Sequence, residues 1–141
     1  CRQLYHITQE REYMRRAELV INYTMTSDRC LQNWILRDEG TNMDGSIFKA
    51  VFVPYAVNLA LDDDTSDFVK KRIKTFLLDN AEALWKNMDR REYPAMYCNY
   101  YWGSMFPSNE IASMGAQASG SSLMEGVARM MVTPEKIKLS L

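Results

Sequence analysis

Four segments of the chain place apolar residues at the three- and four-residue spacing of an amphipathic helix. This spacing predicts helices over residues 10–25, 46–61, 66–87 and 116–132. The second is apolar on most of its circumference, so we expect it to be buried, with Pro54 kinking it or marking a late first turn. The third has the clearest pattern, formed by Val69, Ile73, Phe76, Leu77, Asn80 and Leu84.

The connections between these helices alternate in length. Long segments join the first helix to the second and the third to the fourth, whereas residues 62–65 form a short turn. In the first long segment, Trp34-Ile35-Leu36 is expected to form a short strand or to tuck inward. Alternating short and long connections are typical of barrels and solenoids built from helical hairpins, with function among the long loops. The pattern therefore predicts an all-α fold of about four long helices in two hairpins, without an internal boundary over residues 1–141.

Composition narrows the class of protein. Of 141 residues, 47% are hydrophobic and 25% are charged, which is typical of a globular domain and argues against disorder. The net charge of −1 argues against a general nucleic-acid partner, which would require a basic excess. No stretch approaches the ~20 apolar residues of a membrane span. The chain begins at Cys1 rather than at Met, so we expect it to be cut from a longer protein.

The cysteines and the histidine do not form a recognisable metal-binding or catalytic motif. Cys1, Cys30 and Cys98 are far apart and form no CxxC motif, and His6 is the one histidine. We therefore expect no metal site, no cofactor and no catalysis that depends on histidine. A Cys30–Cys98 disulfide is left open, because spacing alone does not set the geometry.

The acidic run Asp62-Asp63-Asp64 does not fit a calcium-binding loop. Asp67 stands where such a loop needs glycine, and Ile73 stands where it needs glutamate. The run lies in the short turn before the third helix, so we interpret it as a turn and helix cap rather than as a catalytic carboxylate pair.

Two groups of residues are candidates for ligand binding. Residues 93–106 contain six aromatic rings, which could stack on sugar rings or plug the end of a helical barrel. Asp44, Phe48 and Lys49 stand where a long loop enters the second helix. The Lys49 ammonium would either need a buried partner or polar ligand, or extend to the surface.

Several motifs, in order along the chain, resemble those of glycoside hydrolase family 76. The stretch 4–17 is similar to a hairpin start common in helical barrels, and 44–55 is similar to the family's Phe-Lys-Gly helix. The stretch 76–85 resembles its Asn-Ala helix that ends in Trp. Tyr101-Trp102-Gly103 matches a Trp-Gly loop, and Gln117-Ala118-Ser119 corresponds to the Gln-Thr-Ser that opens a late helix.

This resemblance implies part of an (α/α)6 toroid of six hairpins, whose endo-acting family members hydrolyse α-1,6-mannan. The family's catalytic residues are an adjacent Asp-Asp pair in the first half of the domain. The run at residues 62–64 lies in the wrong place to be that pair. The chain thus resembles the C-terminal third of the domain, without the catalytic pair, and is expected to be inactive alone.

The resemblance further implies that the chain contributes to a cleft for an oligo- or polysaccharide. The substrate-binding residues expected on this basis are Asp44, Phe48, Lys49, Tyr101 and Trp102. The parent protein would be secreted, periplasmic or at the cell surface. We also expect the isolated chain to expose an apolar helix face and to self-associate through it.

Two departures leave the specificity open, because Ala50 replaces the family's glycine after Phe-Lys and Pro54 replaces its arginine. One alternative is a non-catalytic helical-repeat protein, such as a SusD-like glycan receptor or a scaffold. Another is a different six-hairpin enzyme, such as a glycuronyl hydrolase or a sugar epimerase.

Overall fold

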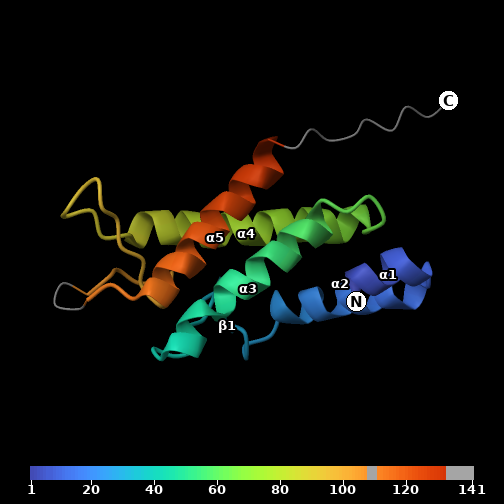
Figure 1. The fold of residues 1–141 in the computed structure, drawn as a ribbon, viewed down its shortest axis with the longest axis horizontal. Coiled ribbons are helices and arrows are strands. Elements are labelled where there is room, and N and C mark those ends of the chain that lie inside the picture. Colours follow the sequence, from blue (N-terminus) through green and yellow to red (C-terminus); the bar gives the residue numbers. More distant parts are fainter. Residues whose placement is uncertain (108–110, 133–141) are drawn as a thin grey trace.

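The computed structural model describes residues 1–107 and 111–132 and is mostly helical (Figure 1). Two short strands pair antiparallel between the second and third helices. The elements are α1 (Arg2–Thr8), α2 (Arg11–Thr24), β1 (Leu31–Gln32), β2 (Ile35–Leu36), α3 (Met43–Ala60), α4 (Asp67–Asn87) and α5 (Met114–Val132). The four long helices and the all-α class predicted from the sequence are confirmed, and α1 is an additional short helix.

The start of α3 lies three residues before its predicted start. The Asn42 side chain accepts a hydrogen bond of 2.6 Å from the Gly45 backbone N–H, which caps the helix at this earlier position. Pro54 therefore lies deep inside α3 rather than in a late first turn, and the helix continues through it.

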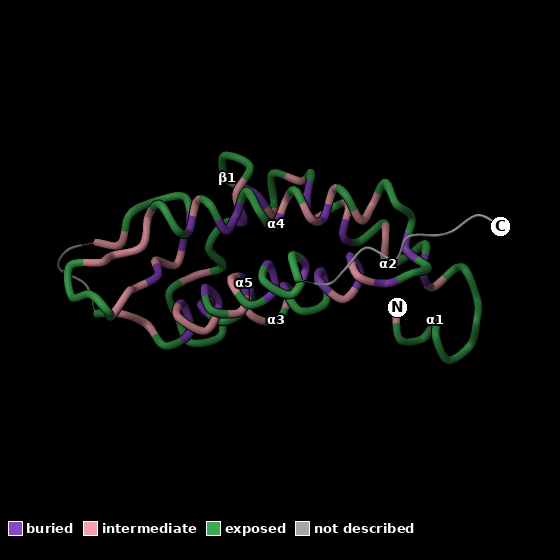
Figure 2. Tube along the Cα trace, turned by 90° about the horizontal axis from the view of Figure 1, so that it is seen from above, coloured by how far each residue is buried: buried purple, intermediate pink, exposed green. Residues whose placement is uncertain are grey.

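The four long helices form two layers. Helices α3 and α5 share the most extensive helix–helix interface, and α4 packs across both of them (Figure 2). The two paired helices run parallel, because Ser119 contacts Ser46 near their starts and Arg129 contacts Asn58 near their ends. The most extensive contact, between α3 and α5, is therefore made between helices of different predicted hairpins.

Close approach of α3, α5 and the loop before α5 depends on glycines of α5. A Cβ atom at Gly126 would lie 2.8 Å from a methyl carbon of Val57 on α3. A Cβ atom at Gly120 would lie 2.4 Å from the Cys98 sulfur. Both distances are shorter than ordinary carbon contacts, so even an alanine at either position forces its neighbour to move.

One side of α3 is exposed, which corrects the expectation that this helix is buried all round. Val53 and Val57 are fully buried against α5, but the apolar residues on the other side face solvent: Ile47, Phe48, Val51 and Tyr55. An apolar helix face is thus exposed, as expected for the isolated chain. Self-association through this face stays a prediction.

Candidate functional site

The structure brings three of the five predicted site residues together. Lys49 of α3 lies against Trp102, and Tyr101 is its neighbour in the loop between α4 and α5. Asp44 and Phe48 lie elsewhere on α3, where both side chains face solvent. The predicted set therefore divides into a buried group and an exposed pair.

Lys49 is the centre of the buried group. Its side chain is only 6% exposed, and its ammonium lies 4.9 Å from the centre of the Trp102 ring. The ammonium donates hydrogen bonds to the backbone carbonyls of Arg37, at 3.1 Å, and of Tyr100. Of the two possibilities for this lysine, the structure shows the buried one, with carbonyl oxygens and an aromatic face as partners.

The environment of Lys49 makes its charge sensitive to pH. Burial lowers the pKa of the ammonium from 10.5 to about 8, although the nearby carboxylates of Asp38 and Glu39 act in the opposite direction. The side chain is therefore mostly charged at pH 7 and mostly neutral above pH 9. Because the ammonium binds the carbonyls of two separate loops, its charge state affects how both loops are held.

Trp102 and Tyr101 support this arrangement from within the fold. The Trp102 side chain is 0% exposed, so neither face of its ring is open to a ligand in the described part of the chain. Tyr101 is also buried, and its hydroxyl donates a 2.6 Å hydrogen bond to the Gln32 carbonyl. Both rings lie inside the fold, and their role in substrate binding stays a prediction.

Asn80 is a further organising residue in the apolar stripe of α4. Its side chain is fully buried; Oδ1 accepts a 2.9 Å hydrogen bond from Leu36 N–H, and Nδ2 donates at 2.8 Å to the Phe76 carbonyl. The helical spacing of the sequence included this residue among the periodic positions of α4 but indicated no role for it. A lone amide among apolar positions is the signal that points to such an anchor, because buried polar groups need partners.

Two residues of the Gln-Ala-Ser motif fix the aromatic loop and α3 to α5. Gln117 donates a 2.9 Å hydrogen bond to the Met96 carbonyl and accepts one from the Cys98 backbone. Ser119 is fully buried and donates a 2.8 Å hydrogen bond to the Ser46 carbonyl. Gln117 and Ser119 thus connect α5 to the aromatic loop and to α3, the two segments that contain Trp102 and Lys49.

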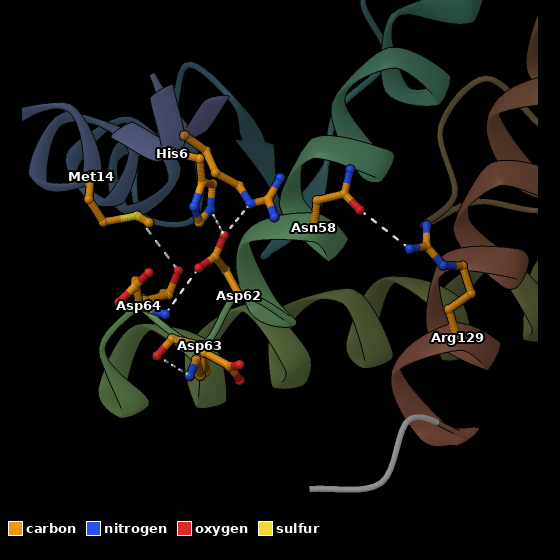
Figure 3. A network of polar contacts seen from close by, with 10 residues as sticks. His6, Met14, Asn58, Asp62, Asp63, Asp64 and Arg129 are labelled. Carbon is orange, nitrogen blue, oxygen red and sulfur yellow. Dashed lines mark hydrogen bonds and ion pairs between the residues drawn. The ribbon is translucent and has the colours of Figure 1, made fainter. Parts of the chain in front are cut away.

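The acidic run lies in the turn between α3 and α4, as predicted, but the N-cap of α4 is Ser66 rather than a residue of the run. Asp62 instead binds α1 (Figure 3). Its buried carboxylate contacts Arg2 Nε, lies 2.6 Å from His6 Nε2 and accepts a 3.0 Å hydrogen bond from Asp64 N–H. Burial alone would raise the Asp62 pKa, but the hydrogen bonds from His6, Asp64 and Arg2 outweigh it and lower the pKa. Asp62 therefore connects α1 to this turn.

The cysteines are free thiols, so the Cys30–Cys98 disulfide left open by the sequence is not formed. Burial raises the pKa of the Cys98 thiol to about 11, which makes it unreactive at neutral pH. Across residues 1–107 and 111–132, no group of three or more His, Cys, Asp or Glu side chains is placed to hold a metal ion. Within the same residues, no helix is both long and apolar enough to cross a membrane.

Comparisons with known proteins agree with this architecture. A structure of the α-1,6-mannanase GH76A of Salegentibacter sp. HEL1_6 is 29% identical, with a TM-score of 0.80 over 90% of this chain. Two inactive variants of that mannanase, each with two aspartates replaced, match equally well, in complexes with α-1,6-mannotetrose and α-1,6-mannotriose. This chain spans 36% of the mannanase chain, about a third of its length.

No curated protein matches the chain. The family model described as glycosyl hydrolase family 76 matches residues 1–136, almost the whole sequence. The family model and the similar mannanase structures both cover most of the chain, so the chain belongs to glycosyl hydrolase family 76.

Proposed function

We propose that the chain is the C-terminal portion of a glycan-degrading glycoside hydrolase that acts on α-1,6-linked mannan. The observation that carries the proposal is the likeness to an α-1,6-mannanase that binds α-1,6-mannotetrose, at a TM-score of 0.80 over 90% of this chain. Family membership favours a hydrolase over the alternative of a SusD-like receptor or scaffold. The substrate would be an oligo- or polysaccharide, and the enzyme would act where such polymers are found, outside the cytoplasm.

In this proposal the catalytic carboxylates come from outside the 141 residues. Retaining glycosidases need one carboxylate as nucleophile and another as acid and base. The Asp62 carboxylate is buried against Arg2 and His6, so it is unsuited to attack a sugar. The chain would supply part of the substrate cleft and would be inactive alone.

The two exposed site residues would contact the substrate directly. The Phe48 ring is 59% exposed and presents an apolar face to a sugar ring, while the exposed Asp44 carboxylate can accept hydrogen bonds from sugar hydroxyls. The buried group of Lys49, Tyr101 and Trp102 would position the loops around these residues from beneath. This division follows from burial, because a covered ring cannot stack on a ligand.

The test is hydrolysis of α-1,6-mannan by the full-length protein and by its Phe48→Ala variant. The wild type should release manno-oligosaccharides, and Phe48→Ala should raise KM by about three- to tenfold, the size expected for one aromatic contact. Phe68→Ala is the matched control, because Phe68 is a similarly exposed phenylalanine on α4. An inactive wild type would contradict the proposed function, and equal effects of the two variants would contradict the role of Phe48.

A further inference from the structure

The tip of the β1–β2 hairpin carries a tryptophan in an unfavourable backbone conformation. The strand register pairs Leu31 with Leu36 and Gln32 with Ile35, so Asn33 and Trp34 form a two-residue loop. Their φ angles are 50° and 67°, and the tight hairpin turn that uses two positive φ angles favours Asn followed by Gly. A tryptophan at the second position meets steric repulsion that a glycine avoids.

The same residue is also unfavourably solvated. The Trp34 side chain is 78% exposed, whereas Ile35 and Leu36, which follow it, turn toward the core. A glycine would lower both the backbone strain and the exposed apolar area at this position. Because Trp34 combines backbone strain with an exposed apolar ring, we expect its side chain to bind a ligand.

The hairpin holds this ring in a fixed place. The Asn80 side chain binds Leu36 N–H at 2.9 Å, and the Tyr101 hydroxyl binds the Gln32 carbonyl at 2.6 Å, one on each strand. Both anchors come from buried side chains, so the loop between them is fixed before any ligand arrives. Such preorganisation lowers the entropy cost of binding.

The hairpin is separate from the exposed pair on α3. Figure 2 shows it projecting from α4 on the side away from α3 and α5, and β2 packs against α4. A ligand on Trp34 would therefore lie apart from one on Phe48. A polymer that binds at both places at once would be held more tightly than one that binds at either place alone.

We propose that Trp34 is a binding site for a polymeric glycan, where the indole face stacks on a sugar ring at a place apart from Phe48. The inference rests on the proposed function for the identity of the glycan class. Indole rings suit this ligand because the C–H faces of a sugar pack on an extended aromatic surface while its hydroxyls stay in water.

The experiment compares Trp34→Gly and Trp34→Ala with the wild type in the full-length protein, by affinity electrophoresis in gels that contain α-1,6-mannan. Both variants should bind the polymer about three- to tenfold more weakly. Hydrolysis of α-1,6-mannotetrose should be unchanged in both. Trp85→Ala is the matched control, because Trp85 is an exposed tryptophan whose ring lies under the Arg90 guanidinium.

Thermal unfolding separates a binding role from a structural one. Trp34→Gly should leave the Tm unchanged or raise it, because glycine relieves the strained backbone. A fall of several degrees would show that the ring packs within the folded protein and would overturn the inference. Unchanged polymer binding, an equal loss in Trp85→Ala, or a wild type that binds no polymer would overturn it as well.

The test also separates this inference from the proposed function. A wild type that leaves mannotetrose uncleaved but binds the polymer through Trp34 would contradict the hydrolase proposal and support the binding site. A wild type that cleaves mannotetrose and binds the polymer equally well without Trp34 would support the hydrolase and overturn the binding site.

Discussion

Replacing Lys49 by methionine tests whether burial in the fold lowers the pKa of its ammonium. Burial lowers the Lys49 pKa from 10.5 to about 8. Between these pH values the unfolded chain binds a proton at this side chain and the folded chain does not. The free energy of unfolding therefore rises with pH in this window, and this contribution is absent in Lys49→Met.

The size of the effect follows from the pKa values. One pKa unit corresponds to about 1.4 kcal/mol, so the stability of the wild type relative to Lys49→Met should rise by about 2–3 kcal/mol between pH 7 and pH 10. Subtracting the variant cancels the titration of tyrosines and cysteines that both proteins share.

The assay is urea unfolding of both chains at pH 7, 8.5 and 10, followed by far-ultraviolet circular dichroism. The difference in unfolding free energy should increase at each step. A difference that stays constant would show that Lys49 keeps an ordinary pKa and that its ammonium is solvated. A difference that falls with pH would show that the fold stabilises the charged form, which contradicts the reasoning.

Three other substitutions test the packing and the polar contacts. Asn80→Ala should lower the free energy of unfolding by about 2–4 kcal/mol in urea titrations, because it opens a cavity and leaves the Leu36 N–H buried without its partner. Gly120→Ala should cost about 1–3 kcal/mol, and less in a Cys98→Ala background where the opposing sulfur is removed. Asp62→Asn should be less stable than the wild type at pH 7, and the difference should shrink as the pH falls below 3.8, because the lowered pKa gives stability that acid removes.

Each of these predictions has a result that contradicts it. Unchanged stability of Asn80→Ala would show that water replaces the amide. Equal costs of Gly120→Ala in both backgrounds would show that Cys98 is not the obstacle. Parallel pH curves for Asp62→Asn and the wild type would show that the carboxylate has an ordinary pKa.

The helices were predictable because their apolar positions recur at helical spacing, as in α4, where Ile73, Leu77 and Leu84 are all buried. The exposed side of α3 could not be predicted in this way. Periodicity detects a helix that is apolar all round, but it does not show which side of the helix has a neighbour. The early start of α3 was missed as well, because the cap depends on the Asn42 side chain and lies before the apolar pattern begins.

The candidate site was predictable only in part. Lys49 stood out as a charge in an apolar helix, and the structure shows it buried. Its partners are the carbonyls of Arg37 and Tyr100, and backbone carbonyls are present at every residue, so no residue type marks them. The hairpin turn was also hidden, because an Asn-Trp loop lacks the glycine that usually signals this turn.

The most direct test of the central claim is the initial rate of product release from α-1,6-mannan by the full-length protein. The same protein is assayed on an α-1,4-glucan at equal concentration. We expect manno-oligosaccharides from the mannan and no product from the glucan. Binding of mannan without any cleavage would contradict this expectation, and so would equal cleavage of both polymers.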